Sequence, residues 1–190
     1  MRHTGIDKRT VRTKLLLCEA LLALLKSKKV GEISVHELCE KAKINRGSFY
    51  KYYNNVPDML AKIEKELFVQ YEKLFTEVTA LSTPDFFVYE CLKLVKENAV
   101  VCRMLLAAEA YGFIRKIALL VHDSTTEYWR TQFGITDEKA LERVYTFVSH
   151  GIIGIIEEWV KNDFDTTPLD LAGTINEMSD SCVDVFIAKK

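Results

Sequence analysis

Residues 34–60 read SVHELCEKAKINRGSFYKYYNNVPDML and contain two short helical patterns joined by a tight turn. Ser34 is expected to cap the first helix, and Glu37 three residues later would complete a capping box. Apolar residues then recur three and four apart up to Ala42, which predicts a short amphipathic helix. Ile44, after the turn, is expected to point into the core.

The second helical pattern carries the polar and aromatic residues that a DNA groove would contact. Asn45 is expected to cap this helix. In a helix-turn-helix the second helix enters the major groove with its first residues nearest the bases. The residues predicted to contact DNA here are Asn45, Arg46, Gly47, Ser48, Phe49, Tyr50, Lys51 and Tyr52.

Several of these residues have two interpretations. Arg46 suits guanine or a phosphate, whereas Asn45 either reads a base or only caps the helix. Phe49 either contacts a thymine methyl group or packs in the core, and Tyr53 is expected in the core. Ser34 offers a hydroxyl and amides to a phosphate, although plain capping explains it equally well.

The charge distribution supports a nucleic-acid partner for the first part of the chain. Residues 1–53 hold twelve Lys and Arg against five Asp and Glu, a charge of +7, whereas residues 54–190 hold fourteen against twenty-two, a charge of −8. A basic module on an acidic body is typical of a DNA-binding domain joined to another domain. Arg9 and Arg12 oppose the dipole of the first helix, and DNA phosphate would offset that cost. Chance clustering on a solvated face is the alternative.

The composition indicates an ordinary globular protein: 190 residues, 48% apolar and 28% charged. Three prolines, eight glycines and long helical periodicities predict an all-α fold of about nine helices. Five irregularly spaced cysteines indicate a reduced cytosolic protein. The sequence shows neither a membrane span nor a signal peptide, so a cytoplasmic location without a membrane partner is expected.

Motifs for catalysis are missing from the sequence. It has no glycine-rich phosphate loop, no His-Glu-x-x-His, no Glu-x-x-His and no Gly-x-Ser-x-Gly. No cysteine pair has metal-ligand spacing. We therefore expect a protein that is not an enzyme and that needs no cofactor or metal.

Residues 141–160 form a helical pattern with one broad apolar face, where two glycines allow a close approach of another helix. That other helix belongs either to the same chain or to a second copy. The residues predicted for this contact are Phe147, Gly151, Ile152, Gly154, Ile155 and Trp159.

The run INRGSFY at residues 44–50, followed by Tyr52 and Tyr53, resembles the recognition helix of the tetracycline-repressor (TetR) family. It is most similar to a subgroup that includes regulators of dihydroxyacetone kinase operons. Two positions depart from the usual pattern. Lys43 replaces a common turn glycine, and Val56 replaces a lysine that contacts phosphate in many members.

The resemblance implies a three-helix DNA-binding head at residues 1–55 and a larger ligand-binding and dimerisation domain at residues 56–190. It also implies phosphate contacts by Tyr50 and Tyr52, a homodimer built from the last two helices, and a palindromic operator in double-stranded DNA. Family members hold a small-molecule effector in the second domain. The candidates here for that pocket are Tyr71, Tyr89, Tyr111, His122 and Trp129.

These expectations add up to a homodimeric TetR-like transcriptional regulator whose DNA binding is modulated by a small molecule or a partner protein. Two alternatives remain at this point. One is a co-regulator of the same fold that binds a partner protein instead of DNA. The other is a helical carrier with a vestigial head.

Overall fold

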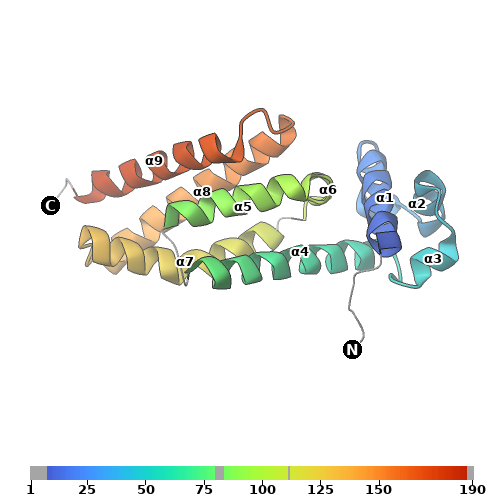
Figure 1. Cartoon of the computed structure of the whole chain (residues 1–190), viewed down its shortest axis with the longest axis horizontal. Helices are drawn as coiled ribbons and strands as arrows, with labels where there is room; N and C mark the ends of the chain where they lie inside the picture. The colour runs from blue at the N-terminus through green and yellow to red at the C-terminus, as the bar shows by residue number, and fades with distance from the viewer. Residues whose placement is uncertain (1–7, 80–83, 111, 188–190) are drawn as a thin grey trace. The chain divides into compact units, whose positions relative to one another are not determined.

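The computed structural model describes residues 8–79, 84–110 and 112–187, and within them the chain is helical without a strand, which confirms the all-α prediction. A 3-10 turn, Val30–Glu32, follows the first helix. The α-helices of the described residues (Figure 1) are α1 Lys8–Leu25, α2 Val35–Ala42, α3 Arg46–Tyr50, α4 Val56–Thr79, α5 Pro84–Glu97, α6 Ala99–Ala107, α7 Gly112–Phe133, α8 Glu138–Lys161 and α9 Pro168–Ile187.

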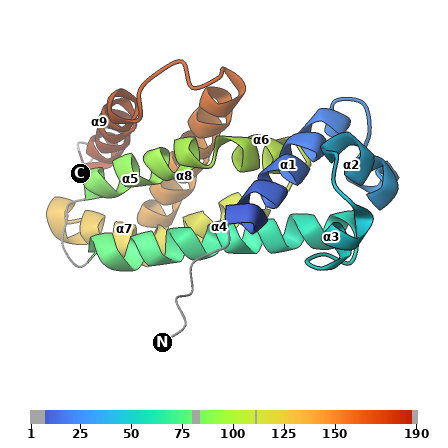
Figure 2. The ribbon, with the colours of Figure 1, turned by 45° about the vertical axis from the view of Figure 1, so that its right-hand side comes forward.

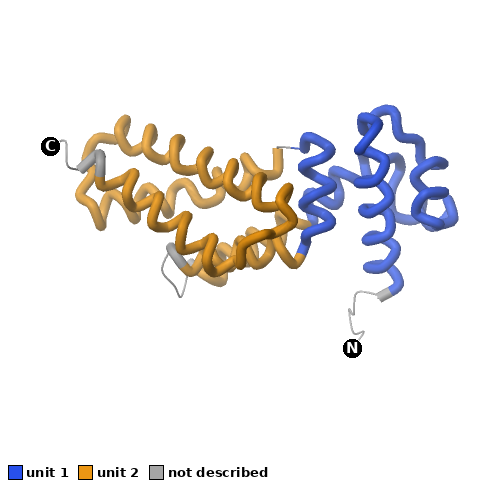
Figure 3. The backbone as a smooth tube through the Cα atoms, turned by 90° about the horizontal axis from the view of Figure 1, so that it is seen from above, with its two compact units in different colours: residues 1–66, 98–111 blue, residues 67–97, 112–190 orange. Residues whose placement is uncertain are grey.

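The chain divides into two compact units, and neither is continuous in sequence (Figure 3). Unit 1 comprises Met1–Glu66 and Asn98–Tyr111, and unit 2 comprises Leu67–Glu97 and Gly112–Lys190. Helix α4 therefore contributes residues to both units, while α6 belongs to unit 1. The functional boundary expected after residue 55 stays a prediction.

Unit 1 is built on α1, which packs against α2 and, more extensively, against α6 (Figure 2). An ion pair between Lys14 and Glu66 also joins α1 to α4. Burying each large apolar side chain contributes about 1.5–3 kcal/mol. The fully buried large side chains of this unit include Leu17, Leu21, Leu38, Phe49, Met59, Ile63 and Met104.

In unit 2, α5 packs against α9, and α7 against α8. An apolar cluster connects α7, α8 and α9 and comprises Trp129, Ile135, Leu141, Val144, Tyr145, Val148 and Val183. Among the described residues, none of the helices combines the length and apolar character needed to cross a membrane.

Candidate nucleic-acid interface and internal cavity

The start of α2 shows half of the expected capping box. Ser34 Oγ accepts a hydrogen bond from the Glu37 backbone N–H at 3.1 Å, which confirms Ser34 as the N-cap. The Glu37 carboxylate instead pairs with Lys28 Nζ at 2.6 Å. The prediction that Glu37 bonds back to Ser34 was therefore wrong, because a lysine competes for its carboxylate.

The turn between α2 and α3 depends on Lys43, which has a left-handed backbone with φ of 55°. Its N–H donates to Glu40 O, and the N–H of Ile44 donates to Cys39 O at 2.9 Å, which ends α2. Ile44 is only half-buried, so it packs less deeply than expected.

Helix α3 begins with the predicted Asn45 cap, whose side-chain oxygen accepts from the Gly47 N–H at 2.7 Å. A Cβ at position 47 would lie 3.1 Å from this oxygen. Glycine therefore leaves room for the cap at the start of the helix.

Phe49 decides how α3 is oriented, because its side chain is 0% exposed. Its ring lies 5.6 Å from that of Tyr50 and 5.5 Å from that of Tyr53. Of the two interpretations of Phe49, the structure supports the core, so its inclusion among DNA contacts is corrected. Tyr53 is buried as predicted, and burial raises the pKa of its hydroxyl.

With Phe49 pointing inward, most of the other residues predicted to contact DNA point outward. Tyr50 is 50% exposed. Val56, by contrast, is only 1% exposed, so it packs in the core where many relatives have a phosphate-binding lysine. The exposed candidates are Arg9, Arg12, Ser34, Asn45, Arg46, Gly47, Ser48, Tyr50 and Lys51.

Tyr52 joins the end of α3 to the start of α1, since its hydroxyl lies 3.1 Å from Thr10 Oγ1 in a hydrogen bond. Thr10 sits between Arg9 and Arg12 in sequence, so this bond brings the basic first turns of α1 close to α3. The Tyr52 carbonyl also accepts from Lys62 Nζ at 3.0 Å, which ties the end of α3 to α4. Three segments are thereby held together around the exposed face of α3.

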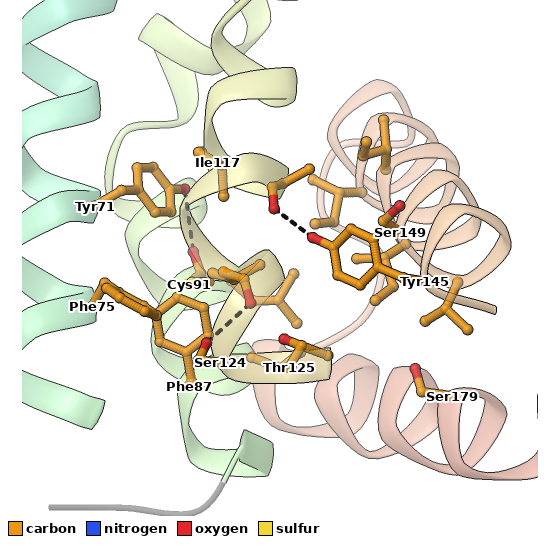
Figure 4. Close-up of a pocket in the computed structure, with 18 of the residues that line it drawn as sticks. Tyr71, Phe75, Phe87, Cys91, Ile117, Ser124, Thr125, Tyr145, Ser149 and Ser179 are labelled. Carbon is orange, nitrogen blue, oxygen red and sulfur yellow. Dashed lines mark hydrogen bonds between the residues drawn. The ribbon is translucent and has the colours of Figure 1, made fainter. Parts of the chain in front are cut away.

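Unit 2 contains a cavity of about 450 Å³ lined by side chains from α4, α5, α7, α8 and α9 (Figure 4). Of the predicted pocket residues, Tyr71 and Trp129 line it, whereas Tyr111 lies outside the described residues. Tyr89 does not line it, because its ring packs beside Phe86 and near Lys93 Nζ.

His122 was also predicted for the pocket, and the structure corrects this. Its Nδ1 lies 2.7 Å from Asp123 Oδ1, and its Nε2 lies 3.0 Å from Glu142 Oε1. The hydrogen bond to Asp123, together with that to Glu142, raises the pKa of His122. Both ring nitrogens are thus engaged by carboxylates that do not line the cavity.

The cavity contains polar groups that sequence reasoning missed, on α9. The lining residues on α9 are Asn176, Ser179 and Asp180. Their spacing of i, i+3 and i+4 places them on one face of the helix. Other polar residues, such as Glu177, Ser181 and Asp184, occur along α9, so the sequence alone does not single these three out. Tyr145 also lines the cavity and donates its hydroxyl proton to Ala118 O.

The predicted dimer contacts lie in three different environments. Phe147 is 70% exposed, and a Cβ placed at the exposed Gly151 or Gly154 would meet no described atom within 4 Å apart from its chain neighbours and the backbone of its own helix. Ile155 is half-buried, and Ile152 lines the cavity.

Trp159 does not fit the predicted interface, since it is only 3% exposed within its own chain. Its indole N–H donates to Thr166 O at 3.0 Å, and its ring packs edge-on against Phe164 at 4.8 Å. Its side chain therefore holds the connection between α8 and α9, which is a correction to the predicted interface.

A model of a TetR-type family, described as the transcriptional regulator C-terminal region, matches residues 82–181, more than half of the chain. The chain belongs to the TetR family of transcriptional regulators. This confirms both the family resemblance and the expectation of a regulator rather than an enzyme. A curated relative, the uncharacterized HTH-type transcriptional regulator YxbF of Bacillus subtilis, is 39% identical over 66 residues. The match covers 30% of this chain and 17% of that protein.

Solved TetR-like structures share the fold over most of the chain. The dihydroxyacetone kinase operon activator DhaS is 15% identical with a TM-score of 0.54, covering 91% of this chain and 97% of its own. The fatty acid degradation regulator FadR from Bacillus halodurans is 13% identical with a TM-score of 0.63, covering 86% and 96%. At these identities the likeness concerns the fold alone.

Proposed function

We propose that this TetR-family regulator binds a palindromic operator through the exposed face of α3. The observation that carries this proposal is the burial of Phe49 between exposed neighbours. An anchored Phe49 turns Arg46, Ser48 and Tyr50 away from the core together. A helix of five residues presents these side chains at its start, where a recognition helix meets the bases.

Each exposed group has a role that suits its chemistry. Arg46 pairs with guanine or with a phosphate, and the exposed Ser48 offers its hydroxyl to a base or to a phosphate. Tyr50 and Lys51 donate to phosphates, as does the start of α2 at Ser34. Arg9 and Arg12 add to the +7 charge of residues 1–53, which neutralises further phosphates.

A homodimer would present two copies of α3 to two half-sites of the operator. A two-fold protein matches a palindrome because both repeat the same contact surface. The exposed Phe147 and the uncovered Gly151 and Gly154 on α8 support this face as the place where a second copy packs. Sedimentation equilibrium measures the oligomeric state directly.

We also propose that a ligand in the unit 2 cavity modulates DNA binding. A ligand shifts an equilibrium only by the difference between its affinities for the two arrangements. Helix α4 runs from Val56 to Thr79 and contributes Tyr71 to the cavity and Met59 to the core of unit 1. Because α4 is one continuous helix, a displacement of its cavity end by a ligand would also move its Met59 end.

The test is fluorescence anisotropy of the full chain with duplex DNA from upstream of its own gene, against a scrambled duplex, at two salt concentrations. Specific binding should exceed non-specific binding by on the order of a thousandfold or more. Arg46→Ala should weaken specific binding by about 1–3 kcal/mol. Lys139→Ala removes an equal charge from an exposed position in unit 2 and should leave binding unchanged.

Contacts to bases and to phosphates give different results in this experiment. Loss of a base contact at Arg46 reduces the preference for the native duplex, whereas loss of a phosphate contact lowers the salt slope by about 1. Equal binding to both duplexes by the unaltered chain, unaffected by Arg46→Ala, would instead support a regulator that acts through a partner protein. The buried Val56, in place of a phosphate-binding lysine, is the observation that keeps this second candidate open.

A further inference from the structure

The wall of the unit 2 cavity consists mainly of apolar side chains from several helices (Figure 4). Phe75 comes from α4, Phe87 from α5 and Ile117 from α7, and Ile152 comes from α8. The volume of about 450 Å³ lies within the range of ligand sites in proteins, roughly 300–1,000 Å³. Covering such a wall is favourable in proportion to the apolar area that a ligand removes from water. A mainly apolar molecule therefore suits this cavity.

Hydroxyl groups also reach the lining, from α4, α7, α8 and α9, and each of those named here already donates its proton to a backbone carbonyl. The bonds run from Tyr71 to Cys91 O (3.4 Å), from Ser124 to Val121 O (3.0 Å), from Tyr145 to Ala118 O, from Ser149 to Thr146 O (3.2 Å) and from Ser179 to Ile175 O (2.7 Å). Figure 4 shows those of Tyr71, Ser124 and Tyr145. An apolar ligand is disfavoured beside polar groups that lose their partners when water leaves. These hydroxyl donors keep their partners, so an apolar ligand can cover them.

The charge of the lining disfavours an ionised ligand. Among the described lining residues there is no Lys, Arg or His. His122 lies behind Tyr145, and both of its ring nitrogens face carboxylates. An anion in the cavity would lose its hydration without gaining a cationic partner, which is costly. Asp180 is exposed and already interacts with another group of the chain, so its carboxylate is not reserved for a cation inside the cavity.

We propose that the cavity takes an uncharged, mainly apolar molecule and discriminates against an anion of the same skeleton. This rests on the cavity being the effector site proposed above, and it specifies the chemical class of that effector. The discrimination comes from the cost of removing a charge from water where the lining offers no counter-charge. A single neutral polar group on the ligand is compatible with the lining, because the Asn176 carboxamide can both donate and accept.

Two fluorescent probes test the charge discrimination directly. N-phenyl-1-naphthylamine is uncharged, and 1-anilinonaphthalene-8-sulfonate is the same aromatic skeleton with one sulfonate added. Both probes become fluorescent in an apolar site, so the full chain can be titrated with each. N-phenyl-1-naphthylamine should bind saturably, with a Kd lower than that of the sulfonate by roughly tenfold or more.

Two matched pairs of variants locate the site and identify the cause. Val121→Phe fills part of the cavity and should weaken binding of the naphthylamine, whereas Leu119→Phe, at a position 74% exposed on the same helix, should not. Thr125→Lys places a cation in the lining and should shift the ratio of affinities toward the sulfonate by roughly tenfold. Thr131→Lys, at an exposed position on the same helix outside the lining, should leave the ratio unchanged. Circular dichroism establishes that each variant is folded.

The outcomes separate the inference from the proposed function. Sulfonate binding as tight as naphthylamine binding, lost in Val121→Phe, would overturn the inference of an uncharged ligand while leaving the cavity as a ligand site. A ratio unchanged by Thr125→Lys would also overturn it, because a weaker sulfonate would then reflect size instead of charge. Saturable binding of neither probe, or binding unaffected by Val121→Phe, would overturn both the inference and the proposed role of the cavity. DNA binding by unit 1 is measured separately by anisotropy and does not depend on these results.

Discussion

His122 on α7 lies between two carboxylates and edge-on to a cavity-lining tyrosine. Its ring centroid is 4.6 Å from that of Tyr145. Glu142, which accepts from His122, belongs to α8, so the imidazole joins the two helices. Burial raises the pKa of Tyr145 to about 12, which keeps its hydroxyl protonated and donating to Ala118 O. A titratable contact therefore sits directly behind one wall of the cavity.

The His122 contact should make stability depend on pH. Because its folded-state pKa is raised above 6.5, the contribution is present below pH 6.5 and is lost as the pH rises through the folded value. His122→Gln should therefore cost more stability at pH 6 than at pH 9, measured by urea unfolding. His36→Gln, an exposed position on α2, serves as the control. An equal cost of His122→Gln at both pH values would contradict the ion-pair account.

At the scale of elements, the end of α2 shows a lysine where the backbone favours glycine. A left-handed conformation costs a side-chain-bearing residue free energy that glycine avoids. Lys43→Gly should raise the free energy of unfolding by about 0.5–1 kcal/mol. Lys41→Gly, in the right-handed last turn of α2, should lower it by about 0.5–1 kcal/mol. Urea unfolding of both variants measures the contrast, and a loss of stability in both would contradict this reading of the turn.

The helices themselves were predictable from sequence because caps and apolar periodicity are local signals. Asn45 and Ser34 cap α3 and α2 as expected. Side-chain direction was less predictable. Phe49 and Trp159 are large aromatic residues that suit either the core or a contact with a partner molecule. Only tertiary packing determines that both are buried within the chain.

The cavity could not be assembled from sequence, because its walls come from helices far apart in the chain. Tyr71 and Trp129 were identified from their aromatic character, but the same reasoning also selected Tyr89 and His122. What separates them is the contact that each ring makes in the fold. The Glu142 carboxylate of α8 holds His122, whereas the Tyr89 ring lies beside Phe86 on its own helix. Periodicity within one helix contains no record of that contact.

At the scale of the whole molecule, substitutions at the two exposed glycines of α8 test the proposed dimer separately from the stability of the fold. There is room within the chain for a side chain at Gly151 and Gly154, and leucine favours helix more than glycine does. A Gly151→Leu/Gly154→Leu variant should therefore fold at least as stably but dissociate into monomers in sedimentation equilibrium. Thr131→Leu, an exposed change on α7, should leave the dimer intact. A double variant that remains dimeric would place the interface elsewhere.

The alternation of the two units along the chain has a consequence for recombination between regulators. Asn98–Tyr111 lies within unit 1, and its Met104 and Leu105 are buried there, although a second-unit segment precedes and follows it in the gene. A single crossover after residue 55 would give the hybrid an α6 from one parent packed on an α1 from the other. A chimaera that keeps the packing of unit 1 therefore has to exchange both of its segments, because unit 1 is not encoded as one continuous stretch.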